Sequence, residues 1–118
     1  MMNQPFFIRD DRRLVRLNLA EIMILKSEDN YLRFLAKDYS YQVRATMEKT
    51  LSQLPEGLFV RIHRSFAVSL NYLEEIGKEK DLVVVGGVPL ALSKQFYPEL
   101  ISRLNIIGGD KEAGKKAG

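Results

Sequence analysis

The feature that most constrains the fold of this sequence is the shortness of its apolar runs, which are of strand length and separated by polar or glycine-containing breaks. Residues 39–44 alternate tyrosine or valine with serine, glutamine or arginine, the period of two expected for a strand with one solvent-exposed face. We therefore expect a mostly β protein. The expected strands are residues 6–9, 13–19, 22–25, 31–36, 39–44, 59–63, 66–70, 73–76, 82–85 and 88–92.

Two segments depart from this period and are expected to form short helices. Residues 46–54 carry apolar side chains at helical spacing, and Thr46 is a suitable N-cap. A second helix is expected to run to about residue 104, with its regular part after Tyr97. The pair Gly86 and Gly87 is expected to close a two-residue hairpin, because glycine adopts positive φ at little cost.

Length and composition favour a single globular domain. The 118 residues are 46% hydrophobic and 28% charged, which is ordinary for a folded protein. We expect an N-terminal extension over residues 1–5, a domain over residues 6–107 and a disordered tail over residues 108–118. The sequence has no cysteine and no apolar run long enough to span a membrane, and its start does not resemble a signal peptide. A cytoplasmic protein without a membrane partner is therefore expected.

The sequence offers little for catalysis. Its only histidine, His63, stands two positions before Ser65, and a serine nucleophile would also need an orienting carboxylate and an oxyanion hole. One histidine among scattered carboxylates does not give the spacing of a metal site. We expect no enzyme activity, no metal and no cofactor, with a hydrolase built on these two residues as a remote alternative.

Charge placement is more informative than the formal net charge of +3. Residues 57–73 contain no acidic side chain, and Arg64 there carries a planar donor fork that suits a phosphate or the edge of guanine. Two further polar breaks contain Asn30, whose amide suits adenine, and the pair Lys94 and Gln95. Taken alone, each break is better explained as a solvated turn; three of them on one β scaffold favour a binding surface.

Three segments together resemble the LytTR family of DNA-binding domains. Residues 22–34 resemble the opening of that domain, with an apolar strand, a polar break and an Asn-Tyr pair. Residues 59–68, Phe-Val-Arg-Ile-His-Arg-Ser-Phe-Ala-Val, are close to its most telling motif, and residues 88–94 resemble its closing motif. The order and spacing agree, and the resemblance spans about residues 6–107.

The resemblance implies an elongated stack of small antiparallel β-sheets with two short helices, whose loops enter successive major grooves of duplex DNA. It implies a bacterial transcriptional regulator that binds paired repeats as two copies, with a receiver or sensor domain that is not on this chain. Asn30, Arg64 and Gln95 become the base-reading candidates. The phosphate-binding or supporting candidates are Lys26, Arg61, His63, Ser65 and Lys94.

Two positions depart from the family pattern. Ser69 stands where the family commonly has asparagine, and Lys94 stands where it commonly has arginine. Lysine lacks the bidentate fork, so a phosphate contact suits Lys94 better than base reading. No cysteine lies near His63, which excludes thiol-based redox control there.

The alternative function is a protein- or RNA-interaction module on the same β scaffold. A single-strand binder needs aromatic side chains spread over an exposed basic sheet. Tyr31, Tyr39 and Tyr41 are the candidates, although we expect them to pack the strand pair.

Overall fold

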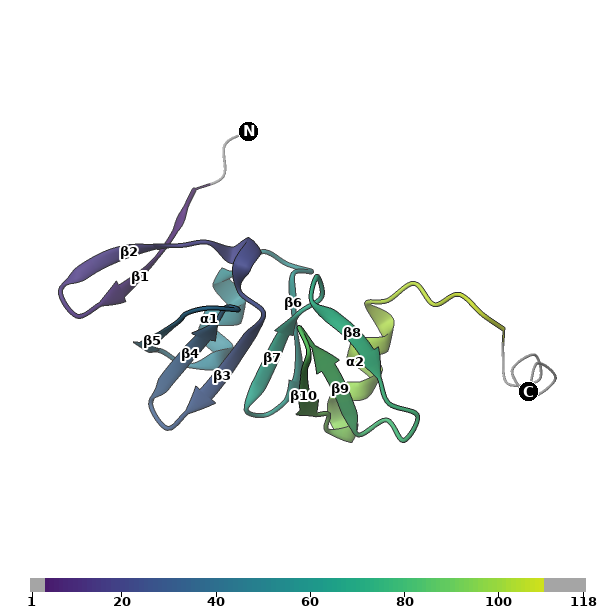
Figure 1. The fold of residues 1–118 in the computed structure, drawn as a ribbon. Coiled ribbons are helices and arrows are strands. Elements are labelled where there is room, and N and C mark those ends of the chain that lie inside the picture. The colour runs from purple at the N-terminus through teal and green to yellow at the C-terminus, as the bar shows by residue number, and fades with distance from the viewer. Residues whose placement is uncertain (1–3, 110–118) are drawn as a thin grey trace.

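The computed structural model describes residues 4–109, in which ten strands form three antiparallel sheets (Figure 1). The first sheet pairs β1 with β2, the second has the order β5-β4-β3-β7-β6, and the third has the order β10-β9-β8. The strands are β1 (Phe6–Asp10), β2 (Arg13–Leu17), β3 (Ile24–Glu28), β4 (Tyr31–Leu35), β5 (Ser40–Arg44), β6 (Phe59–His63), β7 (Phe66–Ser69), β8 (Leu73–Ile76), β9 (Leu82–Val85) and β10 (Val88–Ala91).

Two α-helices complete the fold, α1 (Met47–Gln53) and α2 (Tyr97–Ser102), which confirms the expected mostly β architecture with two short helices. Most of the expected tail lies outside the described residues, as does most of the expected N-terminal extension. No helix within residues 4–109 combines the length and apolarity needed to cross a membrane.

The five-stranded sheet has a hydrophobic core on each face, because alternate residues of a strand point to opposite sides. Leu25 and Leu32 are fully buried in the core that includes residues of α1 and the β1–β2 hairpin. Ile24 and Val68 are buried in the other core, which includes residues of the three-stranded sheet and α2. The molecule is elongated, measuring 59 × 36 × 25 Å.

Both helices begin as the sequence predicts. The Thr46 hydroxyl accepts a hydrogen bond from the amide of Lys49 (3.2 Å) and so caps α1. Pro98 lies in the first turn of α2, where its missing N–H leaves no hydrogen bond unmade. Leu100 of α2 is fully buried and fixes the helix against the sheets.

The bounds of two strands differ by two residues or more from the prediction. β3 begins and ends later than residues 22–25, so Lys26 and Glu28 lie in the strand and only Asp29 and Asn30 form the turn. The apolar run predicts this strand poorly because only Ile24 and Leu25 are buried, whereas the last three residues of β3 are polar and half-buried. The expected strand 13–19 stops at Leu17, after which Leu19–Glu21 form a 3₁₀ turn.

The β9–β10 hairpin supplies a stability prediction. Gly86 and Gly87 both have positive φ, +56° and +82°, but a Cβ on Gly86 would lie 2.4 Å from the sulfur of Met23, whereas one on Gly87 would meet nothing within 4 Å. We expect Gly87→Ala to cost about 1 kcal/mol through backbone strain alone, and Gly86→Ala about 2 kcal/mol or more. Urea unfolding of both variants checks this, and equal losses would show that Met23 yields freely.

Candidate nucleic-acid interface

Three short segments lie at one edge of the molecule, the lower edge in Figure 1. They are the β3–β4 turn with Asn30, the β6–β7 turn with Arg64, and the 3₁₀ turn Lys94–Phe96 that leads into α2. The structure thus brings together the three polar breaks that the sequence places far apart.

Backbone hydrogen bonds connect these segments. The amide of Ser27 in β3 donates to the carbonyl of Ser65 in the second turn (2.9 Å). The amide of Ser93, just before the third segment, donates to the carbonyl of Ile62 in β6 (2.8 Å). Because backbone groups make both bonds, the relative placement of the segments depends on the sheet and not on mobile side chains.

His63 shapes the second turn. Its Nδ1 accepts a hydrogen bond from the amide of Ser65 (3.0 Å), and its ring packs against Phe66 with centroids 5.6 Å apart. An imidazole nitrogen that accepts carries no proton, so in the neutral ring the proton is on Nε2. His63 contacts the backbone of Ser65, so its role is to stabilise the conformation of this turn.

The hydrogen bond between His63 and the amide of Ser65 leads to a prediction about DNA binding. His63→Asn keeps a side-chain acceptor near the position of Nδ1, whereas His63→Phe keeps a ring and removes the acceptor. We expect His63→Phe to weaken DNA binding roughly five- to tenfold, because losing one such hydrogen bond costs about 1 kcal/mol. His63→Asn should bind within about twofold of the parent protein. Fluorescence anisotropy with a duplex measures both, and equal affinity of the two variants would exclude this role of His63.

Arg61 connects the second and third segments. A terminal nitrogen of its guanidinium donates to the carbonyl of Arg64 (2.7 Å), and its guanidinium carbon lies 5.7 Å from the ring centroid of Phe96. Its Nε is buried without a hydrogen-bond partner among the described residues. This geometry favours Arg61 as a support for the edge over Arg61 as a phosphate contact.

The side chains best placed to meet a ligand are exposed. Arg64, Asn30, Lys94 and Gln95 are all exposed at the edge. The Arg64 guanidinium forms no ion pair with a carboxylate of residues 4–109, since the ion pairs there involve Arg13, Lys26, Arg33 and Arg103. Its donor fork is therefore free to bind.

A row of charged and polar side chains beside the first turn was missed by the sequence reasoning. Glu28 pairs with Lys26 (3.2 Å) and with Arg33 of β4 (3.4 Å), and Arg33 also donates to Gln42 of β5 (3.0 Å). The hydrogen bond from Lys26, aided by the charge of Arg33, holds the pKa of Glu28 below its usual value. The register of three strands creates this row, so only correct strand pairing could have revealed it.

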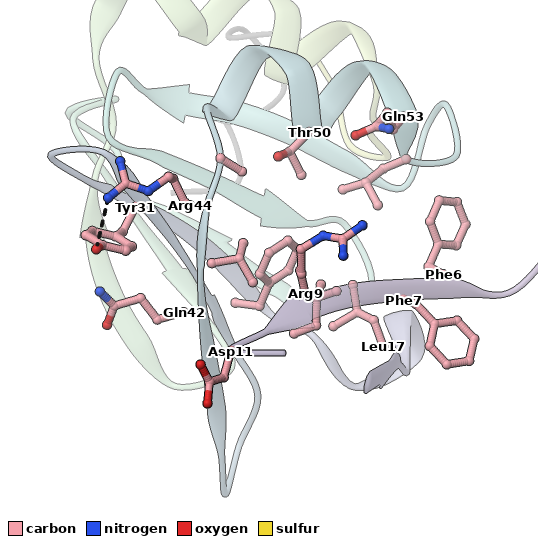
Figure 2. Close-up of a pocket in the computed structure, with 15 residues that line it drawn as sticks. Phe6, Phe7, Arg9, Asp11, Leu17, Tyr31, Gln42, Arg44, Thr50 and Gln53 are labelled. Atoms are coloured by element: carbon pink, nitrogen blue, oxygen red, sulfur yellow. Dashed lines mark hydrogen bonds between the residues drawn. The ribbon is translucent and has the colours of Figure 1, made fainter. Parts of the chain in front are cut away.

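The outer end of the row adjoins a groove between β1 and the β5–α1 region. Arg44 lies over the ring of Tyr31 at 5.3 Å and donates to its hydroxyl, as Figure 2 shows. The groove has a volume of about 580 Å³ and includes Phe6, Arg9 and Leu17 in its lining. Its lining includes Tyr31, the first residue of β4, but none of the residues predicted to bind DNA.

The departure at Ser69 has a structural explanation. Ser69 is 1% exposed, and its hydroxyl accepts a hydrogen bond from the amide of Asn71 (3.2 Å). It thereby stabilises the turn that follows β7. A serine is sufficient for this local role.

Comparisons with known proteins agree with this geometry. Residues 12–105 match the family model described as the LytTr DNA-binding domain, and the chain belongs to that family. The fold matches the LytTr DNA-binding domain of a putative methyl-accepting/DNA response regulator from Bacillus cereus, with a TM-score of 0.74 and 17% identity. That match covers 89% of this chain and 100% of the solved one.

Curated relatives are longer than this chain. The sensory transduction protein LytT of Bacillus subtilis is 29% identical over 97 residues, covering 79% of this chain and 40% of LytT. The sensory transduction protein LytR of Streptococcus mutans is 27% identical over 100 residues, covering 81% of this chain and 41% of LytR. The chain thus spans about two fifths of the curated relatives that it matches.

Proposed function

We propose that this chain binds duplex DNA with sequence specificity as the DNA-binding part of a transcriptional regulator. The observation that carries the proposal is the pair of backbone hydrogen bonds, Ser27 to Ser65 and Ser93 to Ile62, that joins three exposed polar segments into one edge. The family membership supports the same conclusion.

The molecule is longer than one helical turn of duplex DNA. Its longest dimension is 59 Å, whereas one turn of B-DNA rises about 34–36 Å. We place the three segments in successive major grooves, with Asn30, Arg64 and Gln95 reading bases. Lys94 and Lys26 would bind phosphates, which gives affinity and register without sequence information.

The regulatory setting extends the proposal. Because the relatives are sensory transduction proteins of more than twice this length, we propose that a receiver or sensor domain controls the DNA-binding domain. Two copies would occupy paired repeats, and the protein would act in the cytoplasm. No catalytic step is proposed, because His63 is engaged with the backbone of Ser65.

The RNA alternative has weaker support. Tyr39 donates to the carboxylate of Glu21 (2.5 Å), and this contact raises its pKa to about 12. It also packs edge-on against Tyr41, with ring centroids 5.4 Å apart, while the guanidinium of Arg44 lies over one face of the Tyr31 ring. These tyrosines are thus engaged within the protein instead of forming an open stacking surface.

Selection of bound duplexes from a random pool tests the proposal. We expect enrichment of two similar half-sites about one helical turn apart. The enriched duplex should then outcompete single-stranded RNA of equal length in a gel-shift titration. Enrichment of no sequence, or preferential binding of the RNA, would reject sequence-specific duplex recognition.

A further inference from the structure

Two acidic side chains lie near the candidate interface, and one of them has a structural role. Residues 61–66 and 93–97 contain no carboxylate, whereas Glu28 ends β3 and Asp29 follows it in the first turn. Glu28 belongs to the last residue pair of β3 and β4 before the turn, opposite Tyr31. A carboxylate at this position lies close to any polyanion that the turn approaches.

Glu28 holds two basic side chains at once. Its Oε2 lies 3.2 Å from Lys26 Nζ, and its Oε1 lies 3.4 Å from a terminal nitrogen of Arg33. Gln42 holds Arg33 from the other side through a 3.0 Å hydrogen bond. The cluster of Lys26, Glu28 and Arg33 therefore has a net charge of +1 instead of +2, and its cations have fixed positions.

The lower net charge and the fixed positions of the two cations have different consequences for binding to random DNA and for binding to a specific site. Binding to random DNA depends mainly on how many phosphates are neutralised, so a carboxylate beside two cations weakens it directly. A complex on the correct site also depends on base contacts and on a fixed register, and cations already held in place favour that register. Glu28 thus weakens the wrong complexes more than the right one.

We infer that Glu28 is a specificity-determining residue, which restrains Lys26 and Arg33 and suppresses binding to random DNA. The inference rests on the proposed function, because it assumes that the protein distinguishes one duplex from another. Glu28 need not touch a base, since its effect passes through the two cations. Exposed ion pairs contribute little to folding, and the Glu28 side chain is 35% exposed. A purely structural role would therefore leave DNA binding unchanged.

The test is Glu28→Gln, which removes the charge and keeps the shape. Affinity is measured by fluorescence anisotropy on a duplex selected from a random pool and on a scrambled duplex, each over a series of salt concentrations. On the scrambled duplex we expect a gain of roughly five- to tenfold at 0.1 M salt and a salt slope steeper by about 0.9. On the selected duplex we expect a change below about twofold, so the specificity ratio falls.

Two matched variants separate the specific effect of Glu28 from the general effect of removing one negative charge. Asp29→Asn removes a charge one residue away, at a position with φ of +53° that asparagine tolerates. Glu56→Gln removes one from the exposed loop between α1 and β6. Both should lower the specificity ratio less than Glu28→Gln does. Equal reductions in all three variants, or equal gains of Glu28→Gln on both duplexes, would overturn the inference.

The parent protein distinguishes the two possible failures. If it binds selected and scrambled duplexes equally, the proposed function fails and the role of Glu28 fails with it. If it prefers the selected duplex but Glu28→Gln leaves that preference unchanged, only the inference about Glu28 fails. Thermal unfolding of each variant shows whether a change in affinity reflects the folded protein.

Discussion

Arg64→Ala should reduce affinity for a selected duplex by roughly 5- to 150-fold, which corresponds to about 1–3 kcal/mol. Arg64 is exposed in the β6–β7 turn, and this turn lies at the same edge as the other two segments. It has no carboxylate partner among the described residues. In the free protein its donors meet water and no side chain of residues 4–109, so truncation would remove a base contact and leave the fold intact. Anisotropy titrations on selected and scrambled duplexes measure the loss.

Arg64→Lys is the matched variant, because it keeps the charge and removes the bidentate fork. It should bind the scrambled duplex as well as the parent protein does and should still lose most of the preference for the selected one. Equal losses of Arg64→Ala on both duplexes would contradict base reading and would make Arg64 a phosphate contact.

Leu25→Ala should destabilise the protein by about 2–5 kcal/mol, the range for a leucine deleted from a packed core. Leu25 lies in β3, which pairs with both β4 and β7, and its side chain is fully buried in the core beside α1. A cavity there would also loosen the support of the first turn. Urea unfolding followed by circular dichroism gives the change in the free energy of unfolding.

Leu14→Ala serves as the control, since Leu14 is 59% exposed in the β1–β2 hairpin. Its loss should change the free energy of unfolding by no more than about 0.5 kcal/mol. If both substitutions cost the same, the five-stranded sheet would not be the structural centre of the domain.

Much of the fold could be predicted, because the period of two is a local property. Strands β8 and β9 have the predicted boundaries, and the Thr46 cap and the Gly86–Gly87 turn were predicted from residue type alone. The boundary of β3 was not predictable in this way. Its last residues are polar because they face solvent and pair with charged partners on β4, and a single strand gives no indication of its partners.

The polar breaks of the candidate site could be recognised in the sequence, but the contacts that support them could not. The polar breaks predicted Asn30, Arg64 and Lys94 as candidates, and the turns that contain them lie at the same edge (Figure 1). The role of Arg61 in supporting the edge depends on its contact with Phe96, which is 35 residues away in sequence. The restraint on Arg33 depends on cross-strand register. Contacts of this kind follow from tertiary structure and from no local pattern.

The most direct test of the interface is a map of backbone amide chemical shifts by NMR, with and without a selected duplex. We predict that the largest changes in chemical shift fall on residues 29–31, 64–65 and 94–96. These changes should saturate at the same ratio of duplex to protein. Changes confined to the β1–β2 hairpin or to β8, with these three segments unaffected, would contradict the assignment of this edge to DNA.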